Sequence, residues 1–215
     1  MSRGALDDFL AATDLDDLAD AYGALAESLP LDDKRISDVL ASWTDVQAVA
    51  NLLMYPTVIP DELRVAALLR GIRSEGYLRL AAASGIGHLD PGALATDERA
   101  ALIDALLDAV ATDAAVTANR AAVSLAPLLT TADAPLVVEL LDHPAPTVRH
   151  NLEIALLALL DTRELTAIID AAETSVAASA RARLIEDGID LNRPSAEQER
   201  LPLLSYLPNY ADWPS

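Results

Sequence analysis

The sequence contains no cysteine among its 215 residues, so disulfides and thiolate metal sites are excluded. Aromatic residues make up only 4% and glycines number 8, whereas hydrophobic residues reach 52%. The core must therefore consist of alanine, leucine, valine and isoleucine, which favours helices. Long apolar segments are missing too, because the longest uncharged run, residues 46–60, is too short to span a bilayer. The acidic N-terminus does not resemble a signal peptide, so we expect a soluble, cytoplasmic protein.

Lysine is also nearly absent, since Lys34 is the only one beside 14 arginines. Acidic residues number 34 against 15 basic ones, giving a net charge of −19, and aspartate outnumbers glutamate by 23 to 11. A surface of short carboxylates with arginine in place of lysine resembles the proteins of salt-accumulating haloarchaea, where salt screens the self-repulsion. The alternative is an ordinary acidic protein from a high-GC organism. If the acidity is an adaptation to salt, it says little about the partner.

Four segments of similar form recur in the second part of the chain. Each begins near an acid or a proline, continues with a valine or leucine, and then becomes a helix rich in alanine and leucine. Each also follows another predicted helix, and no window shows the strict alternation of a strand. Helix pairs that recur in this way predict an all-α fold, an α-solenoid (superhelix) of antiparallel helix hairpins. The hairpins are expected at about residues 61–89, 97–129, 132–160 and 162–188, with the second helices anchored by Leu78, Val116, Val148 and Val176.

The third of these hairpins resembles a HEAT repeat, including those of phycobilin-lyase-like HEAT proteins. Asp142 in the turn, Pro146, and then Val148-Arg149 opening the second helix match the family pattern. The match is weaker elsewhere: Leu78-Arg79 keeps the arginine, whereas the second and fourth repeats lack it. The resemblance covers roughly residues 61–188. It implies that the aspartate and the arginine bridge neighbouring repeats.

The two ends of the chain differ from the repeats. Residues 1–60 carry 11 acids and 3 bases and are expected to form three or four helices that cap the first hairpin, or else an independent interaction domain. Capping boxes are predicted at Thr44 with Gln47 and at Ser195 with Gln198. Residues 191–215 form a tail whose last part is rich in proline and apolar residues. This strap is expected to pack on the terminal hairpin, or else to dock into a partner.

Residues that could carry catalysis are few. His150 and Glu153, three apart on one helix, could begin a metal site, but there is no second pair at matching spacing. No phosphate-binding or dinucleotide-binding glycine loop and no nucleophile elbow is present. Each histidine is followed by leucine, proline or asparagine, which does not support the His-Glu pairs of HEAT-like hydroxylases. We therefore expect no cofactor and no metal, and a binding protein rather than an enzyme.

Basic residues on the predicted second helices are the remaining candidate site. In a HEAT stack these helices line the concave face, where arginines could bind a carboxylate-rich protein partner. The alternative is that they form ion pairs between repeats. Protein–protein binding or scaffolding is the expected function, by the concave face or the strap. A nucleic-acid-associated, DNA glycosylase-like protein and a lyase-type enzyme subunit remain open. The candidate partner-binding residues are Arg79, Arg120, Arg149, His150, Arg181, Arg183, Tyr206, Tyr210 and Trp213.

Overall fold

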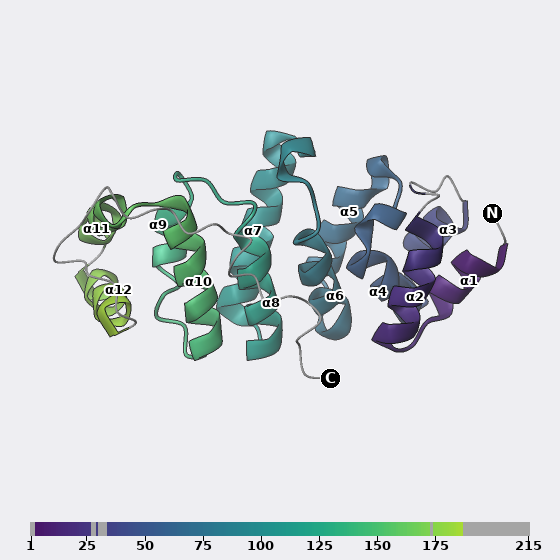
Figure 1. Ribbon diagram of the computed structural model, residues 1–215, viewed down its shortest axis with the longest axis horizontal. Coiled ribbons are helices and arrows are strands. Elements are labelled where there is room, and N and C mark those ends of the chain that lie inside the picture. Colours follow the sequence, from purple (N-terminus) through teal and green to yellow (C-terminus); the bar gives the residue numbers. More distant parts are fainter. Residues whose placement is uncertain (1–2, 27–28, 30–33, 173, 187–215) are drawn as a thin grey trace. The chain divides into compact units, whose positions relative to one another are not determined.

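The structure is a computed structural model that describes residues 3–26, 29, 34–172 and 174–186 (Figure 1). Within these ranges all regular structure is helical, as the sequence predicts, and no helix is long and apolar enough to cross a membrane. The α-helices are α1 (Arg3–Ala11), α2 (Leu15–Ala26), α3 (Lys34–Ser42), α4 (Val46–Met54), α5 (Asp61–Ile72), α6 (Gly76–Ile86), α7 (Thr96–Thr112), α8 (Ala115–Leu125), α9 (Ala134–Val138), α10 (Pro146–Leu159), α11 (Thr162–Ala171) and α12 (Thr174–Glu186). Two short 3-10 helices, η1 (Pro56–Val58) and η2 (Pro91–Ala93), precede α5 and α7.

The chain divides into two compact units, Met1–Ala105 and Leu106–Ser215, and the boundary falls within α7. In the first unit α4 packs against α6, α5 pairs with α6, and α1 packs on α2 and α4. The predicted boundary at residue 60 therefore lies inside this unit, between helices that pack together. The predicted tail from residue 191 lies outside the described residues.

The tightest packing of the first unit lies where α4, α5 and α6 meet. A Cβ atom at Gly85 of α6 would lie 1.7 Å from the backbone oxygen of Leu53 in α4. A Cβ atom at Gly71 of α5 would lie 2.7 Å from a methyl carbon of the same leucine and 2.8 Å from the Cβ of Ala82. The two glycines therefore allow three helices to approach more closely than any larger residue would permit.

A buried asparagine joins α1 to α4. The side chain of Asn51 has no solvent exposure, and its amide nitrogen donates to the carbonyl oxygens of Phe9 and Ala12, each at 2.9 Å. Its side-chain oxygen accepts from Gln47 at 2.9 Å. Asn51 thus satisfies carbonyls at the C-terminal end of α1 that have no partner within the helix.

In the second unit, neighbouring hairpins contact through equivalent helices. The first helices α9 and α11 pack together, as do the second helices α8 and α10. Asn151 of α10 donates to Asn119 of α8 at 2.7 Å. Asp142, in the turn before α10, accepts from Ser179 of α12 at 2.7 Å. Both hydrogen bonds therefore join successive hairpins.

The predicted helix positions agree closely with the structure, but two details are wrong. Val116 is 70% exposed, whereas Val148 is fully buried, so the two cannot be equivalent anchors. The other error concerns α4, whose N-cap is Asp45 and not Thr44, with the Asp45 carboxylate accepting from the backbone nitrogen of Ala48 at 3.1 Å.

Candidate functional site

Arg149, which the resemblance predicts to bridge neighbouring repeats, contacts its own turn. Its guanidinium donates to the carbonyl oxygens of His143 at 2.7 Å and Pro144 at 3.1 Å. It therefore closes the turn that enters α10. Asp142 lies in that same turn, and it is this aspartate that reaches the next hairpin.

The arginines of α12 form ion pairs with nearby carboxylates. Arg181 pairs with Asp170 of α11, within the same hairpin. Arg183 lies 3.9 Å from Asp142, in the preceding hairpin, and 3.9 Å from Glu186 in its own helix. Of these contacts, the one between Arg183 and Asp142 joins two hairpins, as the alternative of ion pairs between repeats predicts.

The remaining candidates do not form one described cluster with them. Arg79 belongs to the first unit and is half-buried, whereas Arg120 and His150 belong to the second. The predicted strap residues Tyr206, Tyr210 and Trp213 lie outside the described residues.

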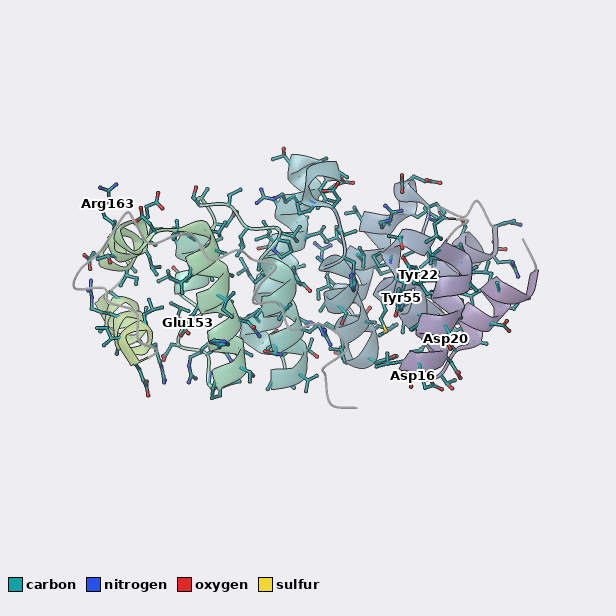
Figure 2. The ribbon with its side chains drawn as sticks, viewed as in Figure 1. Asp16, Asp20, Tyr22, Tyr55, Glu153 and Arg163 are labelled. Carbon is teal, nitrogen blue, oxygen red and sulfur yellow. The ribbon has the colours of Figure 1, made fainter. Side chains whose placement is uncertain are left out.

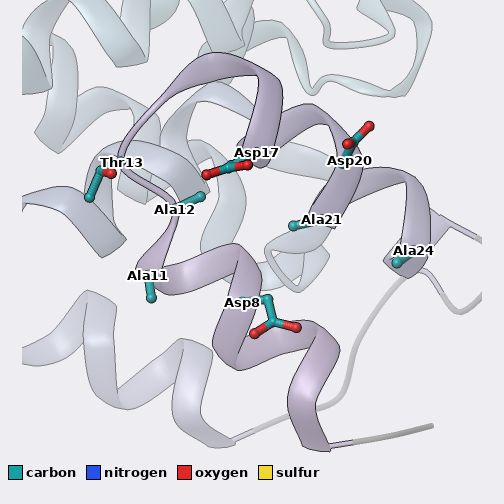
Figure 3. A pocket seen from close by; sticks show the side chains of 8 residues that line it. All are labelled: Asp8, Ala11, Ala12, Thr13, Asp17, Asp20, Ala21 and Ala24. Carbon is teal, nitrogen blue, oxygen red and sulfur yellow. The ribbon is translucent and has the colours of Figure 1, made fainter.

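A groove that the sequence reasoning missed lies between α1 and α2 (Figure 3). It encloses about 480 Å³ and is open to solvent. Small side chains leave the space free, and carboxylates of both helices border it (Figure 3). The lining residues are Asp8, Ala11, Ala12 and Thr13 from α1 and its C-terminal end, and Asp17, Asp20, Ala21 and Ala24 from α2.

Crowded carboxylates make the α2 side of this groove strongly negative. Asp14 accepts from the backbone nitrogen of Asp17 at 2.9 Å, and this hydrogen bond lowers the pKa of the Asp14 carboxyl. The pKa of Asp17 is raised instead, first by its side-chain hydrogen bond with Asp14 and then by repulsion from Asp14, Asp20 and Asp16. A cation placed here would relieve that repulsion.

The spacing along α2 could have revealed the groove. Asp20, Ala21 and Ala24 follow Asp17 by three, four and seven residues, and the four therefore share one helix face. Leu18 and Leu25 are buried on another face. The leucine face predicts the core, whereas the face with Asp17 and Ala21 carries no packing signal.

An aromatic cluster occupies the other side of α2. The rings of Tyr22 and Tyr55 stack with centroids 4.4 Å apart, and Phe9 meets Tyr55 edge to face (Figure 2). The Tyr22 hydroxyl is hydrogen-bonded to that of Thr57 at 3.1 Å. Burial, followed by the proximity of Tyr22, raises the pKa of Tyr55. This cluster fastens α2 to α1 and to the turn after α4.

Glu153 lies buried on α10, while its predicted companion His150 is exposed (Figure 2 labels Glu153). The described part of the chain brings no group of three or more histidine, aspartate or glutamate side chains into a metal-binding arrangement. Among the described residues, His150 and Glu153 therefore do not belong to a larger group of potential metal ligands.

The fold and these sites define an all-α protein of packed helical hairpins with an acidic groove at its N-terminal end. Comparisons with protein-family models, curated proteins and solved structures gave no match.

Proposed function

We propose that this chain is a protein-binding scaffold built from HEAT-like hairpins stacked as a solenoid, and that it works in a highly saline cell interior. The observation that carries the proposal is the contact pattern of the second unit. There α8 packs on α10 and α9 packs on α11, so the second helices of successive hairpins contact each other, as do the first helices. Stacks of this kind present long, continuous helix surfaces, which are used to bind other proteins.

The hydrogen bonds between hairpins support the same reading. The Asn119–Asn151 pair links α8 with α10, and the turn aspartate Asp142 reaches Ser179 of α12. Polar side chains near the packed faces are thus used to hold one hairpin to the next. In this proposal Arg183 serves the same purpose through Asp142, while Arg149 closes the turn before α10, which leaves binding to other surfaces or to the strap.

The test is capture of a partner by the full-length chain from a lysate kept at about 2 M KCl, followed by chemical cross-linking and identification of the linked peptides. Such salt screens non-specific attraction to the acidic surface. A protein recovered in stoichiometric amount, with cross-links to defined helices, is the expected result. Recovery of nucleic acid instead, or of no stoichiometric protein, would overturn the proposal.

Variants show whether the predicted arginines take part in binding. Arg120→Ala combined with Arg181→Ala removes two positive charges from the predicted stripe. Arg73→Ala combined with Arg163→Ala is the matched control, because both residues are exposed and the charge change is the same. If the arginines contact the partner, the first pair weakens capture by about ten-fold, from 1–2 kcal/mol of lost charged hydrogen bonds, and the second does not. If both double variants capture the partner equally well, the partner binds a surface other than the predicted arginine stripe.

A further inference from the structure

The surface of α8 and α10 differs in charge from the helices around it in the second unit. These two helices pack side by side (Figure 1), and their single acidic residue, Glu153, is buried. Other helices of the unit expose carboxylates, as at Asp108 in α7 and Asp170 in α11. The acids of the turns before α8 and α10, Asp113 and Asp142, both have interactions within the protein. Because acids outnumber bases by 34 to 15 in the chain, a helix pair without exposed acids is an exception.

The groups that α8 and α10 present to solvent are donors and an apolar side chain. On α10, His150 and Asn151 follow Thr147 by three and four residues and share its face, on which Thr147 and His150 are exposed. On α8, Val116 is exposed, and Arg120, one turn later, is half-buried and interacts within the protein. His150 is therefore a basic group that this surface offers to a ligand.

An asparagine pair joins the two helices and leaves one donor recessed in the surface. Asn151 donates to the side-chain oxygen of Asn119 at 2.7 Å, and Asn119 is only 9% exposed. The amide nitrogen of Asn119 has no hydrogen-bond partner among the described residues. It nevertheless reaches solvent, because it is not one of the fully buried side-chain atoms that lack a partner. A nine-tenths buried donor in this state favours a ligand with an acceptor oxygen at that point.

A carboxylate suits these donors better than a neutral acceptor does. It accepts through two oxygens, and the His150 imidazole and the Thr147 hydroxyl can donate to it beside the Asn119 amide. Hydrogen bonds to an ionised acceptor are roughly twice as strong as those between neutral groups. Exposed aspartates and glutamates on other helices would repel a carboxylate, whereas α8 and α10 expose none.

We infer that the surface of α8 and α10 binds an acidic segment of a protein partner, whose carboxylates lie on Asn119 and His150 and whose apolar side chains cover Val116. This inference rests on the proposed scaffold function and specifies the chemistry of the partner. Charge complementarity identifies the occupant, because donors without exposed acids are what an acidic segment requires.

The probe is a fluorescent peptide of alternating aspartate and valine, about ten residues long and thus about 33 Å when extended, which crosses two helices packed about 10 Å apart. Matched peptides carry asparagine or lysine in place of aspartate. Fluorescence anisotropy with the full chain, at about 1 M KCl where the Debye length is about 3 Å, measures each dissociation constant. The net charge of −19 opposes binding of the aspartate peptide, so saturable binding requires a local site. We expect the aspartate peptide to bind about ten-fold more tightly than the asparagine peptide.

Two substitutions at exposed positions place a carboxylate on the proposed site. Val116→Asp acts in the first turn of α8, and its control is Val46→Asp in the first turn of α4, where the valine is also exposed. His150→Glu acts on α10, and its control is Ala167→Glu at an exposed position of α11 in the same unit. Each site variant should weaken the aspartate peptide by about ten-fold or more through like-charge repulsion, whereas both controls should bind as the unchanged chain does. Circular dichroism melts verify that all four variants fold.

A third variant tests the recessed donor itself. Asn119→Asp exchanges the amide for an acceptor of nearly the same shape, so the aspartate peptide should lose its advantage over the asparagine peptide. Binding of the aspartate peptide at unchanged strength would show that the Asn119 amide is not the donor. Val116→Asp and His150→Glu decide the test if this buried change prevents folding.

Equal binding of the aspartate and asparagine peptides, no saturable binding of the aspartate peptide, or equal losses in site variants and controls would overturn the inference. So would a dimer in sedimentation equilibrium that the site variants abolish and the controls keep, because the occupant would then be a second copy of the chain. These failures are distinguishable from failure of the scaffold proposal. A partner recovered from the lysate and cross-linked only to other helices would leave the scaffold function standing without this surface.

Discussion

The close approach of α6 to α4 at Gly85 supplies a sharp test of the packing, through Gly85→Ala. The new Cβ atom would lie 1.7 Å from the backbone oxygen of Leu53 and 2.9 Å from its carbonyl carbon. Because the obstacle is backbone, no rotation of a side chain can relieve the clash. The helices α4 and α6 must instead separate by more than 1 Å to bring the oxygen contact beyond 3.0 Å.

The expected cost follows from two opposing effects. Alanine is favoured over glycine within a helix by about 1 kcal/mol. Overpacking a core typically costs about 1–3 kcal/mol and more where the backbone must shift, and separating the helices also weakens surrounding contacts. We expect Gly85→Ala to lower the free energy of unfolding by about 3 kcal/mol net. For a chain of this size, that is a fall in melting temperature of about 6–12 °C.

Two other glycines provide matched controls for the same substitution. Gly23 in α2 is exposed and has nothing within 4 Å of a Cβ atom, so Gly23→Ala should raise the melting temperature by about 2–4 °C. Gly71→Ala should fall between the two, because its clashes are with side-chain carbons, a methyl of Leu53 at 2.7 Å and the Cβ of Ala82 at 2.8 Å, and not with backbone. Melts followed by circular dichroism at about 3 M KCl measure all three. If Gly85→Ala were as stable as the unchanged chain, or the order of the three were different, the close approach of α4 and α6 would be wrong.

Further predictions concern hydrogen bonds, the cap, salt and the tail. Asn51→Ala should cost about 3 kcal/mol in urea unfolding, because buried carbonyls such as that of Phe9 lose their donor, and an unchanged midpoint would refute that role. Asp45→Ala should cost about 1 kcal/mol while Thr44→Ala costs almost nothing, and the reverse order would restore Thr44 as the cap. The net charge of −19 should lower the melting temperature in about 0.1 M KCl relative to about 3 M, whereas equal values would contradict adaptation to salt. Deleting residues 201–215 should lower stability if the strap packs on the last hairpin; an unchanged melt with loss of the partner would make it a docking peptide.

Much of the helical order was predictable because helix signals are local. The helices α5 and α6 lie within the hairpin predicted at about residues 61–89, and α10 ends at Leu159, beside the predicted end of the third hairpin at residue 160. The capping box of α11, formed by Asp161 and Glu164, also follows a recognisable sequence pattern, although it was not among those predicted. Such signals depend on only a few consecutive residues, so they can be recognised without knowing which other helices pack nearby.

The sequence was a poorer guide to which residues of different repeats occupy equivalent positions. Val116 and Val148 share a sequence pattern but differ completely in exposure, because burial depends on which face a neighbouring helix covers. The role of Arg149 was also hidden, since its carbonyl partners are set by the fold of the turn and not by residue type.

The sequence by itself determined an acidic, all-helical chain with helices at nearly their observed bounds, because composition, caps and periodicity act over a few residues. Only the tertiary structure decided that Gly85 meets the backbone of Leu53, that Asn51 closes the end of α1, and that α1 and α2 leave an acidic groove between them. Each of these features joins residues that are far apart in the chain or that lie on different helices. Their positions depend on how helices pack, which local propensity does not specify.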